Sequence, residues 1–216
     1  MSADHTPGRG VSLAVGTGRA LMRVVGRWYD LEVSGGEYIP RRGPVVLAVN
    51  HFSHLDVIVA THLAGRNVRY LAVDELFGES RFFDRLVGYF GAIPMSRKRP
   101  PLGALRAALE ILSEGGAVGL FPEGRRVAHW GESVAKEGAA WLALRAGVPL
   151  VPVSIIGTEE TLSVRERAMR RASIRAWADP PLYPEDFRED SNPRLAMTQA
   201  WQAAVDHRVA HWSLPH

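Results

Sequence analysis

Two short polar stretches hold the side chains of this sequence that are best suited to acid–base or anion-binding chemistry. The first, residues 50–56, reads Asn-His-Phe-Ser-His-Leu-Asp and places His51 five residues before Asp56. If the chain folds back over one helical turn, the imidazole and the carboxylate come into hydrogen-bond contact. A carboxylate in that position fixes the histidine tautomer and stabilises the imidazolium that forms when histidine takes a proton. The spacing therefore predicts a general base.

Two other interpretations of this stretch stay open. Ser53 and Asp56 have the spacing of a helix-capping pair, in which Asp56 accepts hydrogen bonds from backbone N–H groups. That role is compatible with contact to His51. His51, His54 and Asp56 are also plausible zinc or iron ligands, which would suit a metal-dependent hydrolase. Their spacing matches no helical ligand pair, so no metal is expected, and His54 is interpreted as a solvated first-turn residue.

The second stretch, residues 121–126, reads Phe-Pro-Glu-Gly-Arg-Arg. Here Glu123, Arg125 and Arg126 surround Gly124, where the backbone can come close to a ligand. Guanidinium groups bind phosphate through two hydrogen bonds at once, so this turn suits a phosphate-bearing substrate. The alternative is a salt-bridged surface turn.

The elements that must position these residues alternate between short apolar runs and helical patterns. Apolar runs bounded by glycine or proline predict buried strands at residues 44–49, 68–73, 91–94, 116–121, 149–155 and 172–178. Helical patterns occupy residues 54–63, 79–86, 102–112, 134–146 and 193–212. This alternation predicts an α/β fold with a mostly parallel central sheet and helices on both faces.

The polar clusters all follow predicted strands. Residues 50–56 and 121–126 do so, and so does the run Arg97-Lys98-Arg99. A lone charged run is most often a solvated face. Ligands of a parallel sheet, however, bind beyond the carboxyl ends of its strands, so three polar clusters at one edge favour one shared site.

Composition limits the classes of protein that the chain could be. It has 216 residues, 46% of them hydrophobic and 23% charged, which predicts one folded domain. The absence of cysteine excludes disulfides, zinc–thiolate sites and cysteine nucleophiles. Among 26 basic residues only Lys98 and Lys136 are lysines, and this surplus of arginine suits phosphorylated ligands, membranes or nucleic acid. The basic segment 165–175 has no interleaved aromatic residues, so no nucleic-acid partner is expected.

The N-terminal segment has a pattern of its own. Residues 11–28 mix apolar side chains with Arg19, Arg23 and Arg27, which share one helical face. Such an amphipathic helix fits either packing on the core or contact with lipid headgroups. We therefore divide the chain into a tail and amphipathic helix, residues 1–28, and a main domain, residues 29–216. No apolar run approaches the roughly 20 residues that span a bilayer and no secretory signal is recognised, so the expected location is the cytoplasm.

The order of these motifs resembles the glycerolipid acyltransferases typified by bacterial 1-acylglycerol-3-phosphate O-acyltransferase. The similarity extends from about residue 31 to about residue 183. Four family motifs are matched in order by Asn50-His51-x4-Asp56, residues 91–97, residues 121–127 and Val151-Pro152-Val153. Arg125 and Val127 depart from the third motif, Phe-Pro-Glu-Gly-Thr-Arg-Ser. The extra guanidinium of Arg125 favours a molecule that is more anionic or bulkier than lysophosphatidate, which accepts the acyl group in that family.

The resemblance implies direct transfer of a fatty acyl group from acyl-CoA or acyl carrier protein to a hydroxyl of a lysophospholipid, such as 1-acyl-sn-glycerol-3-phosphate, in phospholipid biosynthesis. His51 would be the general base and Asp56 would orient it, without any cofactor. The implied substrate-binding residues are Asn50, Arg97, Glu123, Gly124, Arg125 and Arg126.

The same resemblance implies a peripheral protein on the inner face of the cell membrane, with residues 11–28 as the leading contact. Two alternatives stay open: an acyltransferase that acts on a glycolipid acceptor, and a catalytically silent lipid- or phosphate-binding protein with the same fold.

Overall fold

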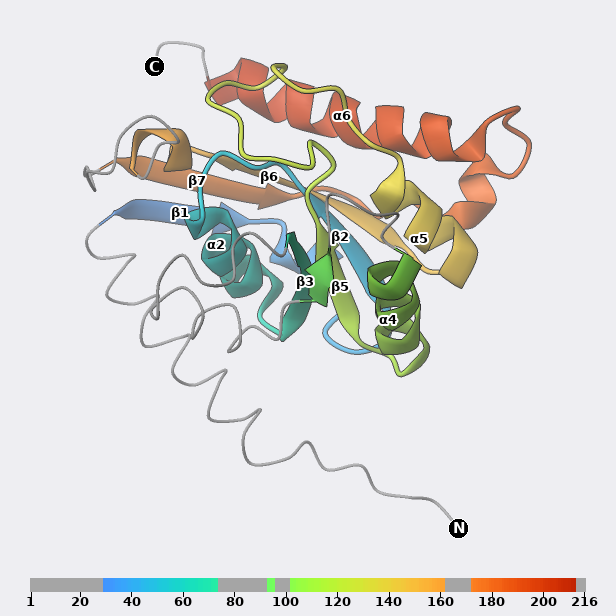
Figure 1. Ribbon diagram of the computed structural model, residues 1–216. Helices are drawn as coiled ribbons and strands as arrows, with labels where there is room; N and C mark the ends of the chain where they lie inside the picture. The colour runs from blue at the N-terminus through green and yellow to red at the C-terminus, as the bar shows by residue number, and fades with distance from the viewer. Residues whose placement is uncertain (1–28, 74–92, 96–101, 162–171, 213–216) are drawn as a thin grey trace, which may run out of the picture.

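A seven-stranded β-sheet forms the centre of the molecule (Figure 1). The computed structural model describes residues 29–73, 93–95, 102–161 and 172–212. Along the sheet the strands lie in the order β1-β7-β6-β2-β5-β3-β4. Their bounds are β1 (Asp30–Ser34), β2 (Val45–Val49), β3 (Val68–Val73), β4 (Ile93–Met95), β5 (Ala117–Leu120), β6 (Leu150–Ile156) and β7 (Ser173–Ala178).

The sheet is mostly parallel, as the alternation of strands and helices predicts. β6, β2, β5, β3 and β4 all run in one direction. β7 is antiparallel to β6, and β1 is parallel to β7, so these two strands run the opposite way. β2 lies between β5 and β6, where Val46 is paired with both Val118 and Leu150. The loop after β2 is therefore held between two neighbouring strands.

Helices cover both faces of the sheet (Figure 1). On one face lies α2 (Leu55–Ala64); on the other lie α4 (Leu102–Ser113), α5 (Gly138–Ala146) and α6 (Pro193–Trp212). Single 3-10 turns form η1 (Gly36–Tyr38), η3 (Thr158–Glu160) and η4 (Pro184–Phe187). No helix in the described part of the chain is long and apolar enough to cross a bilayer.

Each face of the sheet has its own apolar core, because successive side chains of a strand point to opposite faces. Val45, Leu47 and Val49 of β2 belong to the core beneath α2, whereas Val46 and Ala48 belong to the core beneath the other helices. All five are fully buried, which explains why β2 is a continuous apolar run rather than an alternating one. α6 is tied to the same strand, because the indole Nε1 of its Trp201 donates a 2.8 Å hydrogen bond to the carbonyl of Ala48.

The structure differs from the sequence expectations in two elements, and other expected segments lie outside its described residues. β1 was not expected from its sequence. The helix expected at residues 134–146 begins only at Gly138, because residues 133–136 instead close the loop after β5: Lys136 N donates to Pro122 O at 2.8 Å and Ser133 Oγ to Glu123 O at 3.1 Å. The helices expected at 11–28 and 79–86, together with Arg97-Lys98-Arg99, lie outside the described residues.

Candidate active site

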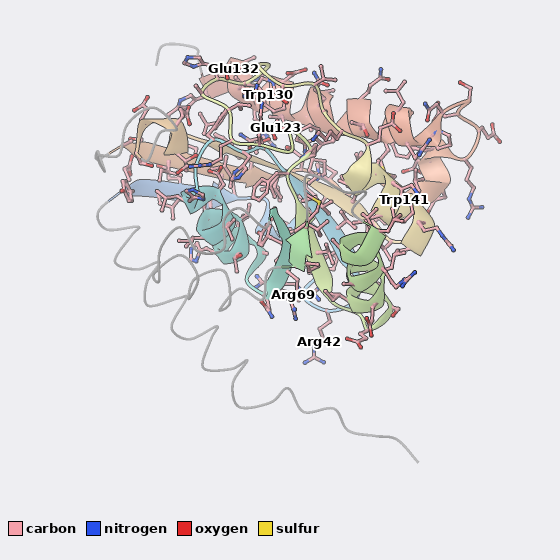
Figure 2. All side chains as sticks on the ribbon, viewed as in Figure 1. Arg42, Arg69, Glu123, Trp130, Glu132 and Trp141 are labelled. Carbon is pink, nitrogen blue, oxygen red and sulfur yellow. The ribbon has the colours of Figure 1, made fainter. Side chains whose placement is uncertain are left out.

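The carboxyl ends of the parallel strands bring three loops together at one edge of the sheet. These are residues 50–54 after β2, residues 121–137 after β5 and the turn η3 after β6. Figure 2 shows Glu123 at this edge, whereas Arg42 and Arg69 lie at the opposite edge. The two clusters predicted to carry chemistry are thus neighbours, as expected for the carboxyl edge of a parallel sheet.

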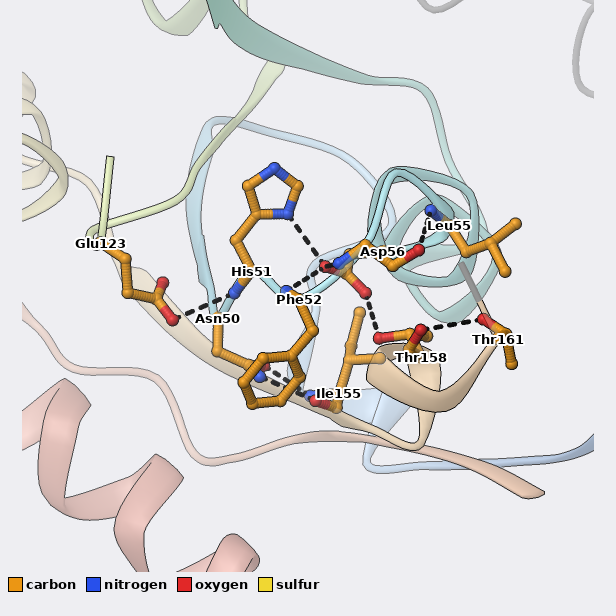
Figure 3. A network of polar contacts seen from close by, with 10 residues as sticks. Asn50, His51, Phe52, Leu55, Asp56, Glu123, Ile155, Thr158 and Thr161 are labelled. Atoms are coloured by element: carbon orange, nitrogen blue, oxygen red, sulfur yellow. Dashed lines mark hydrogen bonds and ion pairs between the residues drawn. The ribbon is translucent and has the colours of Figure 1, made fainter. Parts of the chain in front are cut away.

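His51 and Asp56 are in direct contact. Nδ1 of His51 lies 2.9 Å from Oδ2 of Asp56, and the two side chains are 13% and 0% exposed. An ionised carboxylate has no proton to donate, so Nδ1 carries the proton and Nε2 is left as the basic nitrogen. Figure 3 shows the second ring nitrogen of His51 pointing away from Asp56. The pair therefore has the geometry of an oriented general base.

The Asp56 carboxylate is held by several donors at once (Figure 3). Oδ2 also accepts hydrogen bonds from Phe52 N at 2.7 Å and from Ser53 N at 2.8 Å, while Oδ1 accepts one from Thr158 Oγ1 at 2.6 Å. The position of Asp56 in the first turn of α2 adds the favourable field of the helix N-terminus. Asp56 is thus both a capping residue and the partner of His51, and the two interpretations hold together.

Asn50 fixes the strand that leads into the site. Its Nδ2 donates to Ile155 O at 2.7 Å, and its Oδ1 accepts from Ile155 N at 2.6 Å. The side chain is fully buried, so these two bonds fasten the end of β2 to β6 immediately before His51. Contact between Asn50 and a substrate stays a prediction, whereas its contact with Ile155 is a feature of the fold.

Aromatic rings hold the plane of the imidazole. The ring of His51 stacks on Phe121 with centroids 3.8 Å apart, and Phe121 in turn stacks on Tyr70 at 5.7 Å. Tyr70 fits there because position 119 is glycine: a Cβ on Gly119 would lie 2.3 Å from the Tyr70 ring. The stack restricts rotation of the base about its side-chain bonds.

Glu123 is buried beside His51. It is 3% exposed, and its Oε1 accepts a 3.1 Å hydrogen bond from the backbone N–H of His51. Burial raises the pKa of Glu123 to about 7, the bond from His51 opposes that rise, and the charge of Asp56 adds to it. Oε2 has no hydrogen-bond partner among the residues that the structure describes.

The other residues predicted to bind substrate lie in different settings. Gly124 adopts a left-handed φ of 66°, beside the Lys136 side chain. Arg125 is exposed, and its Nη2 donates to Glu132 O at 3.2 Å. Arg126 is half-buried, and its charge reaches the imidazole of His54. Arg97 lies outside the described residues, so its place in the site stays a prediction.

His54 is not the solvated residue that its sequence position favours. It is half-buried, and burial, with the charges of Arg126 and His51, lowers its pKa to about 4. His54 is therefore a neutral imidazole at neutral pH. In the described part of the chain, no group of three or more acidic, histidine or cysteine side chains is arranged to hold a metal ion. The oxygens of Asp56 are engaged by the four donors above.

Thr158 is the residue of this site that the sequence analysis missed. It comes from the turn after β6, 102 residues from Asp56. The available signal was a polar residue directly after a long apolar strand, at the edge where the other two polar loops lie.

Comparison with known proteins agrees with this fold. A family model described as Acyltransferase matches residues 30–156, which is more than half of the chain. The chain therefore belongs to the acyltransferase family.

Two of the relatives carry the name 1-acyl-sn-glycerol-3-phosphate acyltransferase. The chain is 28% identical over 173 residues to a 1-acyl-sn-glycerol-3-phosphate acyltransferase of Bacillus subtilis, an overlap that covers 79% of this chain and 83% of that protein. It is 26% identical over 160 residues to the chloroplastic 1-acyl-sn-glycerol-3-phosphate acyltransferase BAT2 of Brassica napus, covering 72% of this chain. This chain spans only 46% of the length of the Brassica protein.

A solved structure supports the fold independently. The crystal structure of the 1-acyl-sn-glycerophosphate acyltransferase PlsC from Thermotoga maritima superposes with a TM-score of 0.71 at 23% identity. The match covers 94% of this chain and 81% of the other. The predicted α/β architecture is therefore confirmed.

Proposed function

We propose that this protein transfers a fatty acyl group from acyl-CoA or acyl carrier protein to the free hydroxyl of 1-acyl-sn-glycerol-3-phosphate or a closely related lysophospholipid. The observation that carries the proposal is the 2.9 Å contact between His51 and Asp56, with the second imidazole nitrogen directed away from the carboxylate. The names of the relatives support the choice of acceptor.

In the proposed reaction His51 acts as the base. Its Nε2 takes the proton of the acceptor hydroxyl, and the alkoxide oxygen attacks the carbonyl carbon of the thioester. The tetrahedral intermediate collapses as the C–S bond breaks, and the thiolate receives the proton from the imidazolium. Asp56 stabilises the imidazolium throughout, because its buried charge lies against Nδ1.

The basic residues around the loop after β5 are proposed to bind the acceptor phosphate. Arg126 lies close enough to the site for its charge to act on His54, and Gly124 allows close approach of the backbone. Arg97 is proposed to be a further ligand of the acceptor phosphate. Since Glu123 is buried and hydrogen-bonded to the His51 backbone, its proposed part is to hold the base in place beside the acceptor.

The test is an acyl-transfer assay with the full chain. Labelled palmitoyl-CoA and palmitoyl carrier protein are offered as donors to a panel of lysophospholipids and glycolipids, and products are resolved by mass. We expect a diacyl product from lysophosphatidate, with a smaller yield or none from uncharged acceptors. Transfer of the acyl group to a glycolipid alone would show that the acceptor is a glycolipid and not a lysophospholipid. Lipid binding without transfer from either donor would make the protein a silent binding protein.

We also propose that residues 11–28 attach the protein to the cytoplasmic face of the cell membrane. Arg19, Arg23 and Arg27 recur every fourth residue and suit anionic headgroups. Deleting residues 1–28 is expected to reduce sedimentation with liposomes that contain anionic lipid, and to change little with neutral liposomes. Equal sedimentation of both proteins with anionic liposomes would contradict this attachment.

A further inference from the structure

Thr158, which lies outside every motif recognised in the sequence, is in contact with Asp56. Thr158 Oγ1 donates to Asp56 Oδ1 at 2.6 Å, and both residues are fully buried. The hydroxyl must be the donor, since an ionised carboxylate only accepts. Bonds of this charge-assisted kind are shorter and stronger than those between neutral groups.

We propose that Thr158 is a positioning residue for acyl transfer, whose hydroxyl holds the Asp56 carboxylate in the orientation that keeps His51 a base. The inference rests on the function proposed above. Asp56 Oδ2 is occupied by His51, Phe52 and Ser53, whereas Oδ1 faces the turn after β6 and receives the Thr158 hydroxyl.

The turn that carries Thr158 is fixed independently of its hydroxyl. The carbonyl of Thr158 accepts hydrogen bonds from Thr161 N at 3.2 Å and Thr161 Oγ1 at 2.9 Å, and Gly157 N donates to Glu159 Oε2 at 2.8 Å. None of these bonds uses Oγ1 of Thr158. Replacing Thr158 by valine, which has a similar shape, therefore removes the bond to Asp56 while the bonds that close the turn are kept.

The position of the turn relative to His51 is also fixed. Asn50, the residue before His51, is bonded to both polar backbone atoms of Ile155 in β6. Directly after β6, Gly157 packs so closely on β7 that a Cβ at this position would lie 1.9 Å from Ser173 O. The turn that places the Thr158 hydroxyl against Asp56 therefore follows a strand that is hydrogen-bonded to Asn50, the residue next to His51.

The electrostatic effect of the hydroxyl has a definite sign. Its positive end points at Asp56, so removing it makes the potential at the His51–Asp56 pair more negative and favours uptake of a proton. The titratable or charged groups near the pair in the described part of the chain are His54, Tyr70, Glu123, Arg126 and Glu159. Valine at 158 changes none of them directly, so the shift is attributable to the lost hydroxyl.

The experiment compares Thr158→Val and Thr158→Ser with Thr161→Val in the full chain. Thr161 is an equally buried threonine of the same turn whose hydroxyl binds a backbone carbonyl instead of Asp56. We expect Thr158→Val to lower kcat about 10- to 100-fold with little change in acceptor KM, as for loss of a bond to a charged group. The acidic limb of its pH–rate profile should move up by about 0.5–1 pH unit. Thr158→Ser should restore most of both properties. Thr161→Val loses its side-chain bond to Thr158 O but keeps the Thr161 N–H bond to that carbonyl and the Thr158 hydroxyl on Asp56, so its kcat and pH–rate profile should stay much closer to the wild type than those of Thr158→Val.

A second readout separates this inference from the proposed function. In protein labelled with ¹⁵N-histidine, the His51 imidazole, assigned with a His51→Asn variant, should titrate at higher pH in Thr158→Val than in the wild type. If the wild type transfers no acyl group, the proposed function fails and this titration still decides the role of Thr158. An unchanged titration and pH profile in Thr158→Val would overturn the inference, as would an equal loss of kcat in Thr161→Val. If Thr158→Val does not fold, Thr158→Ala, which removes the same hydroxyl, is judged by the same two results.

Discussion

The backbone N–H of His51 donates a 3.1 Å hydrogen bond to Oε1 of Glu123, a buried carboxyl group 72 residues further along the chain. This bond joins the loop after β2 to the loop after β5. In return, Val127 N donates to His51 O at 2.9 Å. The candidate base is therefore held on both sides of its backbone by a single neighbouring loop.

Glu123→Gln tests whether the carboxyl group is buried with a raised pKa. The pKa of Glu123 is about 7 in the folded protein, against an ordinary value of 4.5, chiefly because of burial. Below pH 4.5 the group is protonated in both states. As the pH rises to about 7 the unfolded chain loses this proton first, so the folded protein loses stability. Glutamine cannot ionise. As the pH rises from 4.5 to 8, the free energy of unfolding of Glu123→Gln should therefore increase by about 2–4 kcal/mol relative to that of the wild type.

Urea unfolding at pH 5 and pH 8 measures this difference. Glu114→Gln is the matched control, because Glu114 is exposed in the turn directly after α4. A pH-independent difference between Glu123→Gln and the wild type would show that Glu123 ionises normally in the folded protein.

Asn50→Ala tests the fastening of β2 to β6. The substitution leaves the N–H and carbonyl of Ile155 buried without their partners, so the free energy of unfolding should fall by about 2–4 kcal/mol. Asn67→Ala, at an exposed position after α2, should change it by no more than about 0.5 kcal/mol. Equal effects of the two variants in chemical denaturation would contradict a structural role for Asn50.

Gly124→Ala tests the turn proposed to face the acceptor phosphate. Gly124 has φ 66° and Gly131, in the same loop, has φ 90°, so alanine at either position should cost about 1 kcal/mol of stability. A Cβ on residue 124 would lie 2.6 Å from Nζ of Lys136, whereas one on residue 131 would meet nothing within 4 Å. We expect only Gly124→Ala to raise the acceptor KM, because its Cβ would be added where the backbone is proposed to approach the phosphate and would displace the neighbouring Lys136 side chain. A similar KM in both variants, measured by steady-state acyl transfer, would argue against this.

The sequence predicts most of the sheet because its strands are buried on both faces. All seven residues of β6 and all five of β2 are buried, so they stand out as apolar runs. β1 escapes this pattern, since it is an edge strand in which Leu31 alone is half-buried and the other residues are exposed. The reversed direction of β7 is set by its pairing with β6, which leaves no mark on residue types.

The candidate site is predictable where its parts are close in sequence. Asp56 is five residues from His51, so a loop that folds back over the first turn of α2 can bring the two side chains into contact. Glu123 was expected at the same edge of the sheet, but its burial and its bond to the His51 backbone depend on how β2 and β5 are aligned. Thr158 reaches Asp56 across 102 residues. That contact follows from the register of β6 on β2, and single-sequence spacing carries no information about it.

The most direct test of the central claim is the rate of diacyl product formation by His51→Ala. The base lies 2.9 Å from a buried carboxylate and directs its second nitrogen away from it, so its loss should lower kcat about 10³-fold or more while circular dichroism and thermal unfolding stay close to the wild type. His62→Ala, on an exposed histidine of α2, should retain full activity. If folded His51→Ala forms the product within about tenfold of the wild-type rate, His51 is not the base and the proposed mechanism is wrong.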